Sequence, residues 1–258
     1  MSSQKRSQNV TTGKEGSQPL TTDRVLRLLS EGEIEVEGLI PWSSNTTLLA
    51  TIRDAEISTL AIYKPLRGER PLWDFRHGTL GLREVAAYLV SEALGWGLVP
   101  PTVLREGTQG PGSVQFFIHA QEEAHFFTIQ DDAIYAGALK RLAAFDVIAN
   151  NADRKSGHCL VDDRERLWAI DNALTFHTEY KLRTVIWSFV DQPLPDEVLA
   201  DLQSFAILLQ QRTPLSLTLE QLLSTSEIIA FRQRVQHLIR AGQYPEPGPG
   251  HTVPWPLV

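Results

Sequence analysis

The sequence predicts an α+β protein with two lobes, the first rich in strands and the second mostly helical. Short apolar runs separated by turn residues fill the first half of the chain, whereas apolar residues at three- and four-residue spacing dominate the second half. With 258 residues, of which 42% are hydrophobic and 21% charged, the chain is large enough to bury a sizeable core. A strand-rich half followed by a helix-rich half indicates an α+β arrangement, and ligand clefts favour the boundary between such lobes.

The first lobe is expected over residues 22–118. Apolar residues at helical spacing predict a short amphipathic helix, and apolar runs between turns predict the strands that follow it. A longer helix then precedes two further strands. The expected elements, in chain order, are a helix at 22–31, strands at 33–40, 48–53 and 59–63, a helix at 78–96, and strands at 103–104 and 113–118.

The second lobe is expected over residues 119–243. Its predicted elements are a long helix at 131–150, a hairpin of strands 159–161 and 167–170, and a helical stretch at 196–241 that Pro214 interrupts. Residues 1–21 contain too few apolar groups to order themselves, so we expect them to be disordered. Residues 244–258 are rich in proline and glycine, which predicts an irregular tail.

Composition and charge narrow the classes of function. The net charge is −7, without the overall basic character expected of a nucleic-acid-binding protein, so no nucleic acid partner is expected. Cys159 is the only cysteine, so no intramolecular disulfide forms. The first 20 residues do not resemble a signal peptide, and no apolar run reaches the roughly 20 residues that span a bilayer. These features favour a soluble cytoplasmic protein without integral membrane association.

Two residues of the first lobe have the positions that phosphoryl transfer requires. This chemistry needs a cation on the phosphates, carboxylates that hold Mg²⁺ and a group that orients the attacking hydroxyl. Lys64 ends the third strand, where its ammonium could reach phosphates, although a solvent-exposed lysine is the simpler interpretation. Glu84 lies in the following helix, away from its apolar stripe, and could either hold the lysine or face water.

Two segments of the second lobe supply the other candidates. Asp153 and His158 have the D-x-x-x-x-N spacing of a kinase catalytic loop, although a turn that ends a helix is the alternative. Asp171 ends an apolar strand, so Asp153 and Asp171 flank one hairpin, and Mg²⁺ favours one or two carboxylates together with phosphate oxygens. An Asp-Asn turn would also explain Asp171. The order of strand lysine, helix glutamate, loop aspartate, hairpin and strand-end aspartate is the order of a kinase.

Several stretches resemble known kinase families. Residues 84–90 and 94–102 resemble a helix and the following turn of type II phosphatidylinositol 4-kinases, and HipA-type protein kinases share a similar layout. Residues 151–154 and 169–176 resemble the catalytic and metal motifs of that family. Residues 63–75 resemble a narrower group of bacterial proteins described as phosphatidylinositol 3-/4-kinase-like. The resemblance covers roughly residues 30–190 and implies a two-lobed protein-kinase-like fold.

The resemblance implies a role for each candidate residue. The implied cofactors are ATP and Mg²⁺, or Mn²⁺ in its place. Lys64 would bind the α- and β-phosphates, Glu84 would orient Lys64, Asp153 would accept the substrate proton or hold the attacking group, and Asp171 would bind the metal. The segments that would contact the rest of the nucleotide are Ser43, Ser44 and Asn45 over the phosphates, and Gln115, Phe116, Phe117 and Ile118 in a linker that meets adenine.

The sequence departs from the family pattern at two points that leave alternatives open. His158 stands where a metal-binding Asn is expected, and a neutral imidazole suits Zn, Fe or Mn better than Mg. The cysteine-rich membrane anchor of the lipid kinases is absent. The main hypothesis is therefore an ATP- and metal-dependent phosphotransferase that acts on a protein or small-molecule acceptor. An inactive nucleotide-binding pseudokinase or scaffold is the alternative, and a lipid kinase is a third interpretation.

Overall fold

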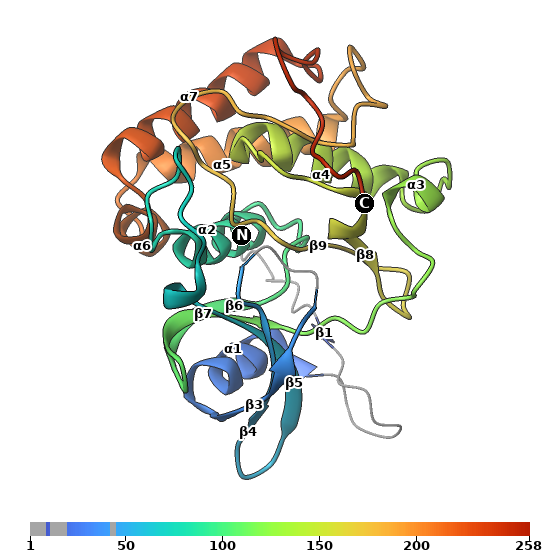
Figure 1. The fold of residues 1–258 in the computed structure, drawn as a ribbon. Helices are drawn as coiled ribbons and strands as arrows, with labels where there is room; N and C mark the ends of the chain where they lie inside the picture. Colours follow the sequence, from blue (N-terminus) through green and yellow to red (C-terminus); the bar gives the residue numbers. More distant parts are fainter. Residues whose placement is uncertain (1–8, 11–19, 42–44) are drawn as a thin grey trace, which may run out of the picture.

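A computed structural model describes residues 9–10, 20–41 and 45–258 and confirms the predicted two-lobed α+β fold (Figure 1). The first lobe is built on an antiparallel sheet of five strands in the order β3-β4-β5-β7-β6. The bounds of its strands are β3 Glu33–Leu39, β4 Leu48–Arg53, β5 Ser58–Pro65, β6 Thr102–Gly107 and β7 Gly110–Phe116. The short strands β1 (Asn9–Val10) and β2 (Leu20–Thr21) pair beside this sheet; most of the predicted disordered segment 1–21 lies outside the described residues.

Helix α1 (Thr22–Glu31) has the predicted bounds because local signals define both of its ends. The Thr21 side chain accepts a hydrogen bond from the Arg24 N–H, which caps the first turn. At the other end, Gly32 leaves the helix and donates its N–H to the Leu28 carbonyl. The buried face of α1 packs against the sheet in a core that Trp168, from the second lobe, also enters.

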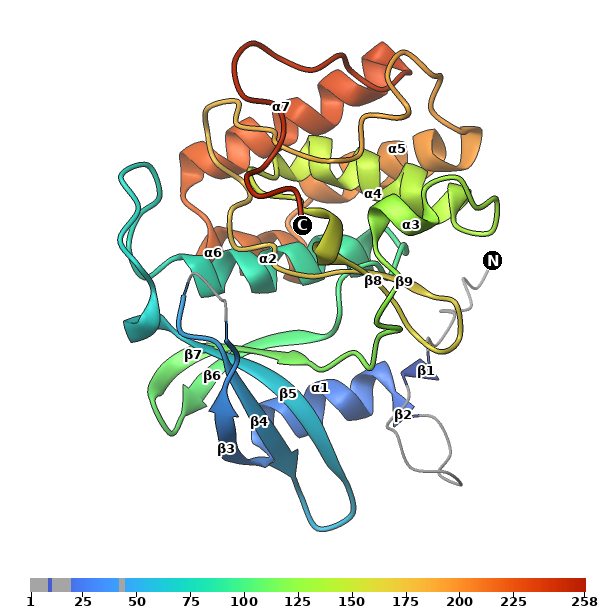
Figure 2. The ribbon, with the colours of Figure 1, turned by 45° about the vertical axis from the view of Figure 1, so that its right-hand side comes forward.

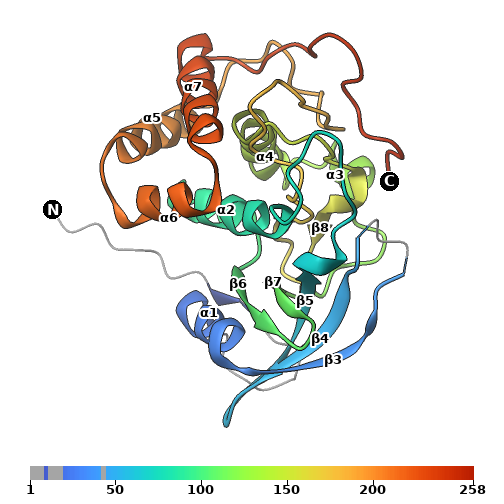
Figure 3. The same ribbon diagram turned by 60° about the vertical axis from the view of Figure 1, so that its left-hand side comes forward.

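Helix α2 (Leu80–Ala93) joins the two lobes. It is almost entirely buried, and the apolar residues of its second half belong to the large core of the helical lobe rather than to the core beneath α1. Leu80, at its start, packs in a separate small cluster. Figure 3 shows α2 between the sheet and the helices of the second lobe. A residue on α2 can therefore reach the sheet on one side and the loops of the second lobe on the other.

The second lobe is mostly helical, as predicted. Its long helix begins at Ala136 rather than near residue 131, because a separate turn of helix precedes it. Pro214 starts a new helix at its first position, where a missing N–H costs nothing, and Thr213 caps it. The bounds are α3 Phe126–Ile129, α4 Ala136–Ala149, η2 Ser156–His158, β8 Cys159–Val161, β9 Leu167–Ala169, α5 Asp196–Gln210, α6 Pro214–Leu222 and α7 Thr225–Ala241.

The last residues of the chain follow an irregular path, as the proline-rich composition predicts. Tyr244 is buried, and its hydroxyl donates to the Lys140 carbonyl of α4. From there the chain returns across the second lobe and its last residues lie beside the loop that follows α4 (Figure 2). Within residues 9–10, 20–41 and 45–258, no helix is long and apolar enough to cross a membrane.

Candidate active site

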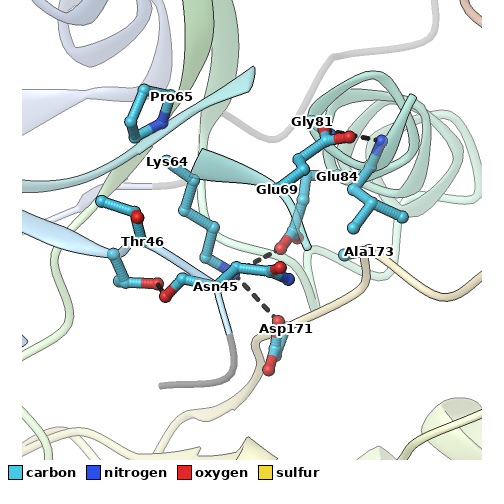
Figure 4. Close-up of a pocket in the computed structure, with 11 residues that line it drawn as sticks. Asn45, Thr46, Lys64, Pro65, Glu69, Gly81, Glu84, Asp171 and Ala173 are labelled. Atoms are coloured by element: carbon cyan, nitrogen blue, oxygen red, sulfur yellow. Dashed lines mark hydrogen bonds and ion pairs between the residues drawn. The ribbon is translucent and has the colours of Figure 1, made fainter. Parts of the chain in front are cut away.

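Three of the predicted site residues meet between the lobes. Lys64 lies at the end of β5, Glu84 on α2 and Asp171 in the loop after β9. The Lys64 ammonium donates to Glu84 Oε1 at 2.5 Å and to Asp171 Oδ1 at 2.9 Å (Figure 4). In the sequence, Glu84 lies 20 positions and Asp171 lies 107 positions from Lys64, so only the fold brings the three residues together.

The Glu84 carboxylate is the central acceptor of this cluster. Its side chain is only 2% exposed, and while Oε1 accepts from Lys64, Oε2 accepts from the Asn172 backbone N–H at 3.0 Å. One buried carboxylate therefore holds both the strand that carries Lys64 and the loop that carries Asp171. A buried carboxylate needs such partners, because an unpaired charge in the interior is costly.

The charges of the cluster reinforce one another. Burial works against the charged form of Lys64, but Asp171 and Glu84 outweigh it and raise the pKa of the ammonium above its ordinary value. In turn, the Lys64 charge holds the pKa of Asp171 below its usual range, although burial opposes this shift. Lys64 is therefore a cation and Asp171 an anion at neutral pH. Asp171 also has a left-handed backbone with φ 55°, which non-glycine residues rarely adopt outside functional or tightly constrained sites.

Asp153 lies in the loop that follows α4. That helix ends at Asn150, which has a left-handed φ of 53°, and the Asn151 side chain then accepts the Asp153 backbone N–H at 2.9 Å. Burial raises the pKa of the Asp153 carboxyl to about 6, Lys155 opposes the shift with Nζ 3.5 Å from Oδ2, and Asp171 adds to it. A carboxylate that titrates near pH 6 is suited to accept a proton.

His158 reaches Asp171 from the other side of the same loop. Its Nδ1 is 2.9 Å from the Asp153 carbonyl oxygen, and its Nε2 is 3.4 Å from Asp171 Oδ2. Burial lowers the pKa of the imidazole to about 4, so the ring is neutral at pH 7. The same Nδ1 lies 3.4 Å from the Lys155 backbone N–H, which can only donate, whereas the nearer Asp153 carbonyl can only accept. The shorter contact favours the tautomer with the ring proton on Nδ1, and this tautomer directs the Nε2 lone pair toward Asp171.

Asp171 and His158 fit a divalent cation. A carboxylate oxygen and an imidazole lone pair that face each other are two acceptors without a proton between them, which is the arrangement of metal ligands. Within the described ranges, this site included, no group of three or more His, Cys, Asp or Glu side chains is arranged to hold a metal. Two protein ligands are few, but Mg²⁺ in phosphoryl-transfer sites takes one or two carboxylates together with phosphate oxygens and water.

A buried network that the sequence analysis did not identify holds both loops in place. Arg154 is fully buried and donates to Asp146, a buried residue of α4, through Nε at 3.1 Å and Nη2 at 3.0 Å. The same guanidinium donates to the Ile170 carbonyl at 2.7 Å and to the Asn172 side chain at 2.6 Å. Arg154 therefore connects the Asp153 loop to the residues on both sides of Asp171.

The phosphate side of the pocket has a second unpredicted residue. Asn45, Lys64, Glu84 and Asp171 line the pocket, as does Glu69 from the segment between β5 and α2. The Glu69 carboxylate accepts the backbone N–H groups of Gly78, Leu80 and Gly81 and so caps the start of α2. Asn45 accepts the Arg70 N–H at 2.8 Å, which ties its loop to the same segment. The other two predicted phosphate-covering residues, Ser43 and Ser44, lie outside the described residues.

The predicted adenine linker lies where the chain leaves the sheet. Gln115 and Phe116 are buried within β7, paired with strands on both sides, and the Gln115 side chain donates to Thr102. The Phe117 N–H donates to the Leu60 carbonyl. Among the described residues, the N–H of Ile118 has no backbone partner. Adenine contacts of this segment remain a prediction, and Ile118 is the residue whose N–H is available for them.

The fold and this cluster define a protein of kinase-like fold, and solved structures agree. The Golgi casein kinase with Mn/ADP bound has a TM-score of 0.57 and 14% identity, over 85% of this chain and 74% of that chain. The structure of hydra Fam20 with sugar has a TM-score of 0.50 and 15% identity, over 85% of this chain and 87% of that chain. At these identities the likeness shows the fold alone.

A curated relative then gives the family. Protein Rv2133c of Mycobacterium tuberculosis is 36% identical over 262 residues, which cover 89% of this chain and 94% of the relative. The chain therefore belongs to the same family as Rv2133c. No protein-family model matches the chain. Because the name of the relative states no activity, the chemistry has to be argued from the site.

The buried Arg154–Asp146 pair gives a stability prediction. In the variant Asp146→Ala, Arg154 is left buried without its carboxylate, so we expect a loss of about 3–5 kcal/mol in the free energy of unfolding. Urea denaturation followed by circular dichroism measures it. The matched control is Glu197→Ala, which removes the partly exposed Arg141–Glu197 pair and should change stability by at most about 1 kcal/mol. Equal losses in both variants would contradict the assigned role of Arg154.

Proposed function

We propose that this protein is an ATP- and divalent-metal-dependent phosphotransferase of the phosphatidylinositol 3-/4-kinase-like superfamily. The observation that carries the proposal is the contact of Lys64 with both Glu84 and Asp171, held together by one buried carboxylate. The motif resemblance and the kinase-like fold support it. We further propose that the protein is bacterial and cytoplasmic, with a hydroxyl group of a protein or small molecule as acceptor.

Each side chain of the site has a role in this proposal. The Lys64 ammonium binds phosphate oxygens, and Glu84 fixes the position of that ammonium. Asp171 and His158 would hold a divalent cation, which would supply positive charge against the phosphates of the nucleotide. The Golgi casein kinase structure contains Mn and ADP, and the imidazole ligand here likewise supports Mn²⁺ beside Mg²⁺.

Asp153 is the proposed general base. Its carboxylate lies on the loop whose other end carries His158, so it is held close to the metal ligands. The raised pKa means that the carboxylate is charged at neutral pH but accepts a proton more readily than an ordinary Asp. In the proposed reaction, Asp153 orients the acceptor hydroxyl and takes its proton as that oxygen bonds to the γ-phosphorus. The bond between the γ-phosphorus and the β–γ bridging oxygen breaks, and ADP leaves.

Replacement of the two aspartates should separate binding from chemistry. We expect Asp153→Ala to reduce phosphotransfer from ATP by about 10²–10⁴-fold, because a general base contributes about that factor. It should leave the thermal stabilisation by ATP with Mn²⁺ intact. Asp171→Ala should abolish both phosphotransfer and the metal-dependent part of that stabilisation. The measurements are thermal shift and release of radiolabelled phosphate.

The matched control is Asp163→Ala, which removes an exposed aspartate on the turn between β8 and β9. This variant should behave as the unaltered protein in both assays. If the unaltered protein neither binds ATP with Mg²⁺ or Mn²⁺ nor transfers phosphate, the proposed function is wrong. If Asp153→Ala retains full phosphotransfer, Asp153 is not the base.

The pH dependence follows from the Asp153 carboxyl. Because its pKa is about 6 and the base must be deprotonated, kcat/KM should rise through pH 6 to a plateau and fall about tenfold per pH unit below it. A cation bound at Asp171 would lower that midpoint, since it removes the repulsion between the two carboxylates. The variant Lys155→Met should raise the midpoint, because Lys155 favours the charged carboxylate. A flat profile between pH 5 and 8 would rule out this assignment.

A nucleotide-binding pseudokinase is the second candidate, and His158 is the observation that favours it. The substitution His158→Asn tests which candidate holds. If His158 is an adapted metal ligand, as the phosphotransferase proposal requires, the change should lower Mn²⁺-dependent activity by about tenfold or more. If activity rises instead, His158 marks a degraded kinase site. The assay compares phosphotransfer at saturating Mg²⁺ and Mn²⁺ for both proteins.

A further inference from the structure

Residues 250–258, here called the terminal segment, lie against the loop that carries Asp153. The Leu257 carbonyl accepts the Ser156 backbone N–H at 2.8 Å, only three residues from Asp153. Further back, the Thr252 carbonyl accepts the Thr184 N–H at 3.1 Å and the Trp187 indole N–H at 3.0 Å. Figure 2 shows the red end of the chain beside this loop.

The contacts of the terminal segment fall on the backbone that positions the catalytic loop. The Arg183 N–H donates to the Asn151 carbonyl, and the Arg154 N–H donates to the Arg183 carbonyl. The chain around Thr184 therefore pairs with the Asp153 loop on one edge and with the terminal segment on the other. The terminal segment therefore lies on the side of residues 183–184 that faces away from the Asp153 loop.

The terminal segment is held at both of its ends and is stiff. Before it, Gly248 packs so closely on the Tyr180 ring that a β-carbon there would lie 2.4 Å from Cε1. Within it, Pro254 is buried, and proline restricts the backbone freedom that docking would otherwise cost. Together with the hydrogen bond at Leu257, these contacts fix the segment along the Asp153 loop rather than leaving it in solvent.

The position of this segment limits how an acceptor reaches Asp153. The nucleotide side of the site is the pocket of Lys64, Glu84 and Asp171, so the acceptor has to approach the loop from elsewhere. On the Ser156 side, the start of α3 already contacts the loop, because the Phe127 N–H donates to the Ser156 hydroxyl. The terminal segment contacts the same residue, because the Leu257 carbonyl accepts the Ser156 N–H, so two parts of the chain lie on this side of the loop.

The side chains of residues 252–258, which make up most of this segment, are uncharged and partly apolar. No charged side chain occurs among residues 252–258. Trp255 is 88% exposed, and Val253 and Leu257 are 45% and 37% exposed. Exposed apolar side chains that gather in one patch can mark a ligand-binding surface. They would favour a neutral, partly apolar acceptor and would give no charge to recognise an acidic or basic peptide.

We propose that the terminal segment forms one wall of the acceptor site and that the acceptor is a small hydroxyl-bearing molecule with an uncharged body. The wall excludes a polypeptide acceptor, even an unfolded one, from Asp153. This inference rests on the proposed phosphotransferase function and specifies the class of its acceptor.

The test compares the full chain with a variant that lacks residues 250–258. Two acceptors serve as probes: water, measured as ATP hydrolysis, and dephosphorylated casein. The full chain should hydrolyse ATP but transfer little phosphate to casein, and the deletion should raise casein phosphorylation by about tenfold or more, because removal of a covering segment opens a site to larger acceptors. Equal casein phosphorylation by both proteins would overturn the proposal.

Two further variants keep the result interpretable. Pro254→Gly retains the full chain length but loosens the segment, so it should raise casein phosphorylation in the same direction even if the deletion fails to fold. Glu246→Ala changes an exposed residue outside the terminal segment and should change nothing. Amide hydrogen exchange supplies a readout without catalysis: the Ser156 and Thr184 amides should exchange faster in the deletion, while the Arg183 amide stays protected.

The outcomes separate the two proposals. If no variant turns over ATP, the proposed function itself is wrong, and the acceptor inference falls with it. If ATP is hydrolysed but casein phosphorylation is the same with and without the terminal segment, only the acceptor inference is wrong. Unchanged exchange at Ser156 and Thr184 in the deletion would likewise overturn the docking of the segment.

Discussion

The buried Glu84 carboxylate is the contact on which the geometry of the site depends. It is nearly inaccessible, and its two oxygens accept from groups of different lobes, the Lys64 ammonium and the Asn172 N–H. Loss of either partner would leave a charge poorly compensated in the interior, so the structure favours the arrangement in which both are present. Because α2 packs in the core of the second lobe, its contact through Glu84 also fixes Lys64 relative to that lobe.

Arg83, next to Glu84, is a second buried charged residue of α2, and it holds an outer helix in place. Its guanidinium pairs with Glu227 of α7, donates to the Thr175 carbonyl and lies over the Phe75 ring. Two adjacent residues of one helix thus connect the sheet, the loop after Asp171 and α7. Arg154 does the same for the Asp153 loop through Asp146. The site is therefore positioned by charge pairs inside the protein, whereas Asp171, a proposed metal ligand, remains partly exposed.

The sequence predicts those parts of the fold that local signals determine. Helix α1 has a Thr cap and a Gly exit, and Pro214 begins a helix, so their bounds follow from nearest neighbours in the chain. The candidate site residues could be proposed because they resemble a known order, yet their contacts span up to 107 residues. Arg154 and Glu69 could not be found in this way. An arginine or glutamate in a polar loop is ordinarily exposed, and only the tertiary structure shows the buried partners that hold these two inside.

The two partners of Lys64 differ in a way that bears on nucleotide binding. Glu84 is 2% exposed and also holds Asn172, whereas Asp171 is 42% exposed and has His158 as a second neighbour. A partly exposed ion pair contributes little to stability, about 0–1 kcal/mol, so the Lys64–Asp171 contact can be exchanged at small cost. The contact with Glu84 cannot, because it is buried. In the proposed function, Lys64 would therefore keep Glu84 as a fixed partner while a phosphate took the place of Asp171, and the Asp171 oxygens would then be available to a cation.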